Sequence, residues 1–140
     1  MEIFKTKEGI TIVNDCYNAN FDSMKAAIES IAKMDGKRKI AILGDMLELG
    51  KFSKDLHYNV GLEVVKNNID VLITVGKESK NIAEATKNST IPSENVHMFD
   101  KNEDAIQLLK SMLTGGDIVL IKASNGMKFI EIVNALKNFE

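Results

Sequence analysis

The sequence predicts an α/β protein, in which a mostly parallel β-sheet lies between two layers of helices and a β-hairpin precedes it. The first observation is an alternation: short apolar runs and amphipathic segments follow one another five times, as strands joined by crossover helices do. The second is the composition of the runs. Ile40–Leu43 and Ile118–Ile121 are continuously apolar, which is typical of strands buried on both faces. Right-handed crossovers between such strands give a three-layer, Rossmann-like sheet.

Local signals place the boundaries of the elements. Asn20 is a good N-cap, which puts Phe21 at the first helical position. Ser53 is expected to cap the next helix, and Asp100 with Glu103 three residues later resembles a capping box. The expected elements are a hairpin over 2–13, a helix over 21–34, a strand over 39–43, a helix from 53, a strand over 71–75, a weaker helix near 82–86, a strand over 96–99, a helix ending before 115, a strand over 118–121 and a final helix through 129–136.

Polar clusters follow the expected strands. They occupy 14–20, 44–48, 76–79 and 122–125. Because the carboxyl ends of parallel strands share one edge of a sheet, we expect these clusters to converge there, where open α/β folds bind ligands. No repeat or linker interrupts the pattern, so a single domain over residues 1–140 is expected.

The composition fits an ordinary globular protein and argues against several functions. The 140 residues are 44% apolar and 27% charged. A net charge of −2, without a basic stripe carrying aromatic residues, disfavours nucleic acid as a partner. The apolar runs are too short to span a membrane, and the N-terminus does not resemble a signal peptide. One cysteine, Cys16, excludes an internal disulfide and suits a cytoplasmic protein.

Common signatures of phosphate, metal and nucleophile sites are missing. The dinucleotide fingerprint G-x-G-x-x-G is absent, and Gly50–Lys51 cannot end a P-loop because Phe52 stands where Ser or Thr is required. His57 and His97 lack metal-ligand spacing, so we expect a half-buried helix residue and a strand residue. No motif links either histidine to Cys16. We therefore expect neither a metal site nor a catalytic nucleophile.

Two polar stretches are candidates for ligand binding. In Asn14–Met24, eight of the eleven residues carry a polar group, which is more than a turn requires. Lys122–Met127 offers a cation, a hydroxyl and a helix N-terminus, a combination that suits a carboxylate. Alternatively, Lys122 only extends toward solvent and Ser124 only caps the last helix. A phosphorylation receiver would also use such a lysine, but Gly76 stands where its phosphoacceptor aspartate is needed.

Three segments together resemble a known family. Asp15–Met24 resembles a D-x-Y-N-A-N-P-x-S-M motif, and Val119–Met127 resembles a V-L-x-K-G-S-R-x-M segment. Leu43–Gly50, with His57 beyond it, is similar to L-G-D-M-x-E-L-G…H. The three segments occur in the same order in the Mur ligases. Asp15–Met24 and Leu43–Gly50 resemble most closely the type that adds D-alanyl-D-alanine to a peptidoglycan precursor. The resemblance covers residues 10–136 and concerns the C-terminal domain of that family.

The resemblance implies cofactors and partners. Such ligases have an N-terminal domain that holds a UDP-sugar, a central domain with the P-loop, and a C-terminal domain that closes over both. ATP and Mg²⁺ would be held mainly by the central domain, which would be a partner of this chain. The substrates would be D-alanyl-D-alanine and UDP-N-acetylmuramoyl-tripeptide. The chain would be a fragment that is inactive alone, with Met1 an added or internal start near a domain junction.

The resemblance also implies roles for individual residues. Asp45, on the same edge, would orient a ligand or, as we favour, only a loop. In a ligase domain, the side of the site that faces the nucleotide, nearest the ribose and adenine, would comprise Asp15, Tyr17, Asn18 and Asn20. The side that faces D-alanyl-D-alanine would comprise Lys122, Ser124 and Asn125.

The alternative to a ligase domain is a free-standing, Rossmann-like module that binds a nucleotide or another small ligand.

The sequence departs from the family pattern at three positions. Phe21 replaces a proline at the first helical turn, which removes a preset φ but no contact group. Ala123 replaces a glycine, so φ at this position must be negative. Asn125 replaces an arginine, which removes a bidentate clamp for a carboxylate and weakens the implied dipeptide contact.

Overall fold

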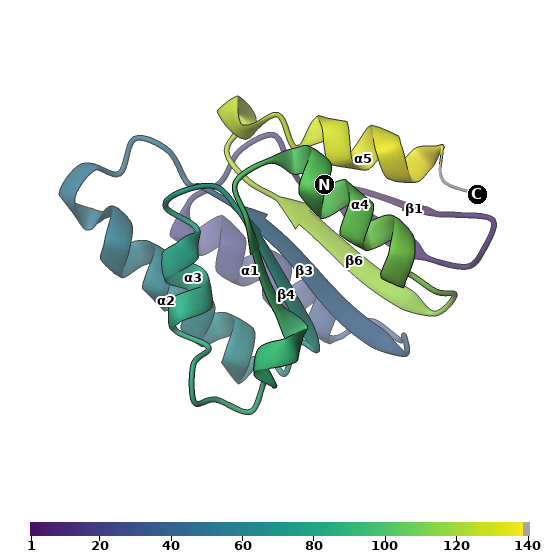
Figure 1. The fold of residues 1–140 in the computed structure, drawn as a ribbon, viewed down its shortest axis with the longest axis horizontal. Helices are drawn as coiled ribbons and strands as arrows, with labels where there is room; N and C mark the ends of the chain where they lie inside the picture. Colours follow the sequence, from purple (N-terminus) through teal and green to yellow (C-terminus); the bar gives the residue numbers. More distant parts are fainter. Residues whose placement is uncertain (139–140) are drawn as a thin grey trace.

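A computed structural model of the protein describes residues 1–138. This part of the chain folds into six strands and five α-helices, whose arrangement can be followed in Figure 1. The strands are β1 (Glu2–Lys5), β2 (Thr11–Asn14), β3 (Arg38–Gly44), β4 (Val71–Val75), β5 (Val96–Phe99) and β6 (Asp117–Lys122). The helices are α1 (Phe21–Ala32), α2 (Ser53–Lys66), α3 (Lys80–Glu84), α4 (Asn102–Met112) and α5 (Ile130–Lys137), and short 3₁₀ helices are η1 (Gly50–Phe52), η2 (Ser93–Asn95) and η3 (Asn125–Met127).

The strands form one sheet in the order β1-β2-β6-β3-β4-β5. Only β1 and β2 pair antiparallel, as the predicted hairpin, and every other neighbouring pair is parallel. At the carboxyl edge Leu43 is opposite Lys122, and Asn14 is opposite Ile121. The predicted fold class, a mostly parallel three-layer sheet behind a hairpin, is confirmed. No described helix is both long and apolar enough to cross a membrane.

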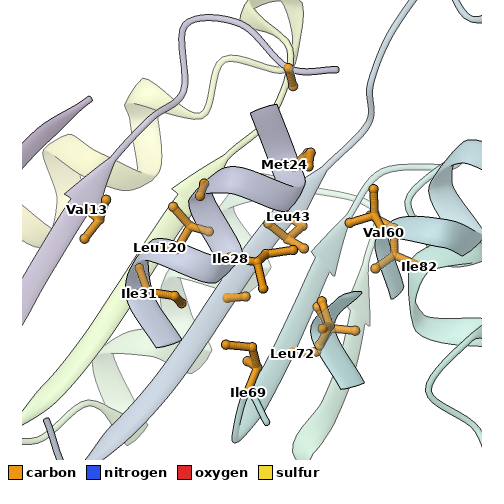
Figure 2. Packing of buried hydrophobic residues seen from close by; sticks show 14 of the residues in the cluster. Val13, Met24, Ile28, Ile31, Leu43, Val60, Ile69, Leu72, Ile82 and Leu120 are labelled. Atoms are coloured by element: carbon orange, nitrogen blue, oxygen red, sulfur yellow. The ribbon is translucent and has the colours of Figure 1, made fainter. Parts of the chain in front are cut away.

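Helices cover both faces of the sheet. In Figure 1, α4 and α5 lie over one face, and α1 lies behind the strands. Alternate residues of each buried strand therefore enter different cores: Ala41 and Leu43 pack toward α1 and α2, whereas Ile40 and Ile42 pack toward α4 and α5. Figure 2 shows the first core, where Ile28 of α1 packs among strand side chains. Burial on both faces explains the continuously apolar runs.

The start of α1 follows the prediction. Asn20 is the N-cap: its Oδ1 accepts the backbone N–H of Ser23 at 2.8 Å, and the Ser23 hydroxyl oxygen accepts the N–H of Asn20 at 3.0 Å. This reciprocal pair is a capping box. Phe21 is the first helical residue, so a helix can begin here without the family's proline. Ala123 is buried with a φ outside the left-handed region, as its replacement of glycine requires.

Two other predicted caps are wrong. Ser53 is the first residue of α2 rather than its cap, and its hydroxyl donates to Glu78 at 2.8 Å. The N-cap position of α4 is Lys101, without a capping side-chain bond, and Asp100 lies outside the helix, where it forms an exposed ion pair with Lys80 at 3.0 Å. In both cases the side chain that was expected to cap a helix contacts a residue distant in the sequence instead.

Candidate functional site

The loops after β3, β4 and β6 are joined by hydrogen bonds at the carboxyl edge of the sheet. The backbone N–H of Ser124 donates to the carbonyl oxygen of Asp45 at 3.1 Å, and the N–H of Leu47 donates to the Ser124 hydroxyl at 2.9 Å. The carboxylate of Asp45 accepts the N–H of Ser79 at 2.7 Å. The predicted convergence of these polar clusters is confirmed. Asp45 is 5% exposed, and these hydrogen bonds link it to the two neighbouring loops.

Glycines allow these loops to approach closely. Gly76 has a φ of +124°, and a Cβ there would lie 2.4 Å from the Asp45 carboxylate. A Cβ on Gly126 would lie 2.9 Å from a methyl carbon of Leu47. A larger residue at Gly76 would clash with the Asp45 carboxylate in a left-handed backbone conformation, whereas at Gly126 it would displace only the end of the exposed Leu47 side chain.

A buried ion pair joins the loop after β2 to the end of β6. The Lys122 ammonium lies 2.8 Å from Asp15 Oδ2 and donates a second hydrogen bond to the Asn18 carbonyl oxygen at 2.9 Å. The Lys122 side chain is 1% exposed, whereas that of Asp15 is 21% exposed. Lysine does not extend to solvent here, so that alternative is wrong. The pair brings together one residue from each predicted side of the site.

A depression of about 450 Å³ lies beside this ion pair. Tyr17, which is 80% exposed, and Asp15 contribute to its wall from the loop after β2, and Asn125 contributes from the loop after β6. The charge of Asp15 is offset by Lys122, and the lining adds the carboxylate of Glu2, which accepts from Asn14, together with a thiol, amides and the Tyr17 phenol. This chemistry suits hydroxyls and amides of a neutral ligand better than a phosphate group. Its lining residues are Met1, Glu2, Asn14, Asp15, Cys16, Tyr17, Asn125 and Ile130.

The remaining predicted site residues use their side chains within the protein. Asn20 caps α1, and the side-chain oxygen of Asn18 accepts the N–H of Ala19 at 2.9 Å. The Ser124 hydroxyl binds the loop after β3 instead of capping α5, so that alternative for Ser124 is wrong. Among the seven predicted contact residues, Tyr17 and Asn125 are those with an exposed side chain at the depression.

Cys16 is a poor nucleophile in this setting. Its thiol lies 2.9 Å from the side-chain oxygen of Asn14, whose amide donates to Glu2 at 2.9 Å. Burial raises the pKa of the Cys16 thiol, and the carboxylates of Asp15 and Glu2 raise it further. The thiol is therefore neutral at ordinary pH and acts as a hydrogen-bond donor.

Sequence reasoning missed a buried network behind the loop after β3. His57 is fully buried, not half-buried, and its Nε2 accepts the N–H of Met46 at 2.9 Å. Ser53 and Glu78 extend the network toward α3. The His57 position in the motif was a signal for it, but only the fold reveals its partner. Within residues 1–138, no group of three or more His, Cys, Asp and Glu side chains is arranged so that it could hold a metal ion.

A mostly parallel sheet with helices on both faces, polar strand-end loops at its carboxyl edge and a depression beside them is the architecture of a Rossmann-like α/β domain. The family model described as "Mur ligase, glutamate ligase domain" matches residues 1–125. The chain belongs to this family.

Its relatives are longer proteins. The UDP-N-acetylmuramoyl-tripeptide–D-alanyl-D-alanine ligase of Bacillus subtilis is 39% identical over 137 residues, which cover 97% of this chain and 30% of that protein. The Escherichia coli ligase of the same name is 35% identical over 132 residues, or 93% of this chain and 27% of that protein. The crystal structure of the MurF ligase from Thermotoga maritima in complex with ADP superimposes with a TM-score of 0.80 and 27% identity, and covers 97% of this chain and 30% of that one. The chain thus spans about 30% of the length of such relatives.

Proposed function

We propose that this chain is the C-terminal domain of a UDP-N-acetylmuramoyl-tripeptide–D-alanyl-D-alanine ligase, which works in cytoplasmic peptidoglycan precursor synthesis. One observation carries the proposal: the three motif segments meet at a single edge of the sheet, where Lys122 contacts Asp15 and Ser124 contacts Leu47. The alignment with ligases of that name over 97% of the chain supports the same assignment. Two further domains would hold the UDP-sugar and the triphosphate with Mg²⁺.

Within this ligase, the loop after β2 faces the nucleoside part of ATP. Tyr17 offers an exposed ring and hydroxyl to the adenine or ribose, and Asp15 offers the carboxylate oxygen that Lys122 leaves free. Asn18 and Asn20 belong to the same wall and support it, because their side chains fix the turn and the start of α1. A charge-neutral pair beside an exposed ring fits a nucleoside, whereas the triphosphate is left to the central domain.

The loop after β6 faces the D-alanyl-D-alanine acceptor. Asn125 presents an exposed amide that can donate to the terminal carboxylate of the dipeptide. Lys122 adds a positive charge near this wall, but its ammonium group is paired with the carboxylate of Asp15. Ser124 contributes by holding the loop after β3, through the hydroxyl that accepts from Leu47. An amide replaces the family's arginine here, so the acceptor is held by fewer charged contacts.

The reaction that these walls serve is amide formation through an acyl phosphate. ATP phosphorylates the terminal carboxylate of the tripeptide, and the amine of D-alanyl-D-alanine then attacks the acyl carbon and displaces phosphate. Such a reaction gains its rate from alignment of the reactants and exclusion of water. This domain contributes by closing over the nucleotide and presenting the acceptor, while the chemistry takes place against the other domains.

The isolated 140-residue chain provides the test. It is expected to produce no UDP-N-acetylmuramoyl-pentapeptide from ATP, the tripeptide and D-alanyl-D-alanine, because it lacks a triphosphate site. Turnover by the chain alone would contradict the proposal. Calorimetry with ATP distinguishes the alternative: tight nucleotide binding by the isolated chain, together with an inactive full-length protein, would favour a free-standing binding module.

A further inference from the structure

His57 is bonded at both of its ring nitrogens, although no ligand contact is assigned to it. Nε2 accepts the N–H of Met46 at 2.9 Å, and Nδ1 lies 2.7 Å from the carbonyl oxygen of Ser53. A carbonyl oxygen can only accept, so Nδ1 carries the proton and Nε2 presents its lone pair. These bonds fix a single neutral tautomer in a fully buried ring.

The loop over residues 45–49 needs such support. Glu48 has a φ of 64°, a left-handed value that a residue with a side chain adopts when its surroundings hold it there. Three consecutive residues of this loop are held from three different elements: by Ser79 before α3, by His57 of α2 and by Ser124 after β6. The anchors at His57 and Ser79 are fully buried, and His57 is the one that holds the loop through a side-chain ring.

Ser124 connects loop 45–49 to the residues that line the depression. Its N–H donates to Asp45, and its hydroxyl accepts from Leu47, so the serine and the loop move together. The next residue, Asn125, lines the same depression as Tyr17. A displacement of the loop would therefore move the amide that faces the ligand.

We propose that His57 is a positioning residue for the dipeptide side of the site. It holds loop 45–49 through Met46, and the loop holds Ser124, which in turn places Asn125. His57 itself touches no ligand. The inference rests on the proposed ligase function for its kinetic consequence, whereas its structural part concerns this chain alone.

Two substitutions separate this role from simple filling of space. His57→Gln places an amide oxygen close to the position of Nε2, so Met46 keeps an acceptor. His57→Asn keeps a donor near Nδ1 but leaves the Met46 N–H without a partner. His97→Asn, on β5 and outside the network, is the matched control.

The first measurement uses the isolated chain and does not depend on activity. ¹⁵N NMR of the imidazole is expected to show a protonated Nδ1 and an unprotonated Nε2. Amide hydrogen exchange at Met46 and Leu47 is expected to be at least about tenfold faster in H57N than in H57Q. Equal exchange in the two variants, or a proton on Nε2, would overturn the proposal.

The second measurement uses the full-length ligase. H57N is expected to raise KM for D-alanyl-D-alanine about tenfold, while kcat and KM for ATP change less than about twofold. H57Q should restore most of the loss, and H97N should leave all three constants unchanged. Equal changes in both KM values would assign His57 a purely structural role. If H57N does not fold, Ser124→Ala must give the same selective rise in the dipeptide KM, and its absence overturns the proposal.

The two measurements test the positioning role of His57 and the proposed function separately. If the unsubstituted full-length protein joins no D-alanyl-D-alanine, the proposed function is wrong, and the exchange data alone decide whether His57 holds the loop. If the protein is active but the dipeptide KM is insensitive to H57N, the positioning role is wrong and the proposed function stands.

Discussion

Lys122 and Asp15 are 107 positions apart in the sequence, yet their side chains form an ion pair of 2.8 Å at the end of the sheet. The ammonium is buried and also donates to Asn18, so it fixes the loop after β2 against β6. A buried pair of this kind contributes little net stability, but the loss of one partner leaves the other charge without compensation.

Lys122→Met is expected to lower the free energy of unfolding by about 2–4 kcal/mol, because it leaves the partly buried Asp15 carboxylate unpaired. Urea denaturation measures the change. Lys80→Met is the matched control: its ammonium lies 3.0 Å from Asp100, and the two side chains are 50% and 74% exposed, so less than about 1 kcal/mol is expected. Similar losses in the two variants would show that the buried pair has no special weight.

Asn20→Ala is expected to cost about 1 kcal/mol of stability, because it removes the side-chain half of the capping box on α1. Thermal unfolding of this variant should show a lower midpoint. Asn59→Ala, at an exposed position inside α2, should be neutral or slightly stabilising. An unchanged unfolding midpoint for Asn20→Ala would show that the Asn20 side chain does not stabilise the start of α1.

Cys16 should react slowly with iodoacetamide. Burial raises the pKa of this thiol above its ordinary value of 9.0, so the thiolate is scarce at neutral pH. The rate in the folded chain is expected to keep rising beyond pH 9.0, whereas the urea-unfolded chain should level off earlier. Fast labelling of the folded chain at pH 7, matching the unfolded rate, would refute this environment.

His97 should make stability depend on pH. Partial burial lowers its pKa in the folded state below the ordinary value of 6.5, so the unfolded chain binds the proton more readily. The contribution of neutral His97 to the free energy of unfolding is fully present above pH 6.5 and is lost as the pH falls through the pKa of the folded state. His97→Gln should therefore flatten the decline in unfolding free energy between pH 7 and pH 5. An identical decline in both proteins would contradict the assignment.

Asp15→Ala in the full-length ligase is expected to raise KM for ATP more than KM for D-alanyl-D-alanine, since we place this carboxylate on the nucleotide wall. Tyr17→Ala should show the same selectivity without loss of stability, because the ring is exposed. Steady-state kinetics with each substrate varied in turn measures both effects. Equal changes in the two KM values would contradict the division of the walls.

The order of strands and helices could be predicted because it depends on local apolar periodicity. The starts of α2 and α4 could not, because Ser53 and Asp100 are bonded to Glu78 and Lys80, which are distant in the sequence. The convergence of the polar loops follows from parallel topology alone.

The side-chain contacts within the site could not be predicted from the sequence. The pairing of Lys122 with Asp15 depends on β2 lying next to β6, and a single sequence carries no signal for that neighbour relationship. The family resemblance places these two residues on different sides of the site, and the structure shows that their side chains are in contact. The full burial of His57 likewise depends on how α2 packs against the loop after β3.

A chimeric ligase tests the central claim most directly. The N-terminal and central domains of the Bacillus subtilis relative, which is 39% identical over the aligned region, would be joined to this chain in place of their own C-terminal domain. The rate of ATP-dependent addition of D-alanyl-D-alanine to UDP-N-acetylmuramoyl-tripeptide is the measurement. The account predicts turnover that Asp15→Ala and Asn125→Ala reduce. A folded chimera without turnover, beside an active parent enzyme, would contradict it.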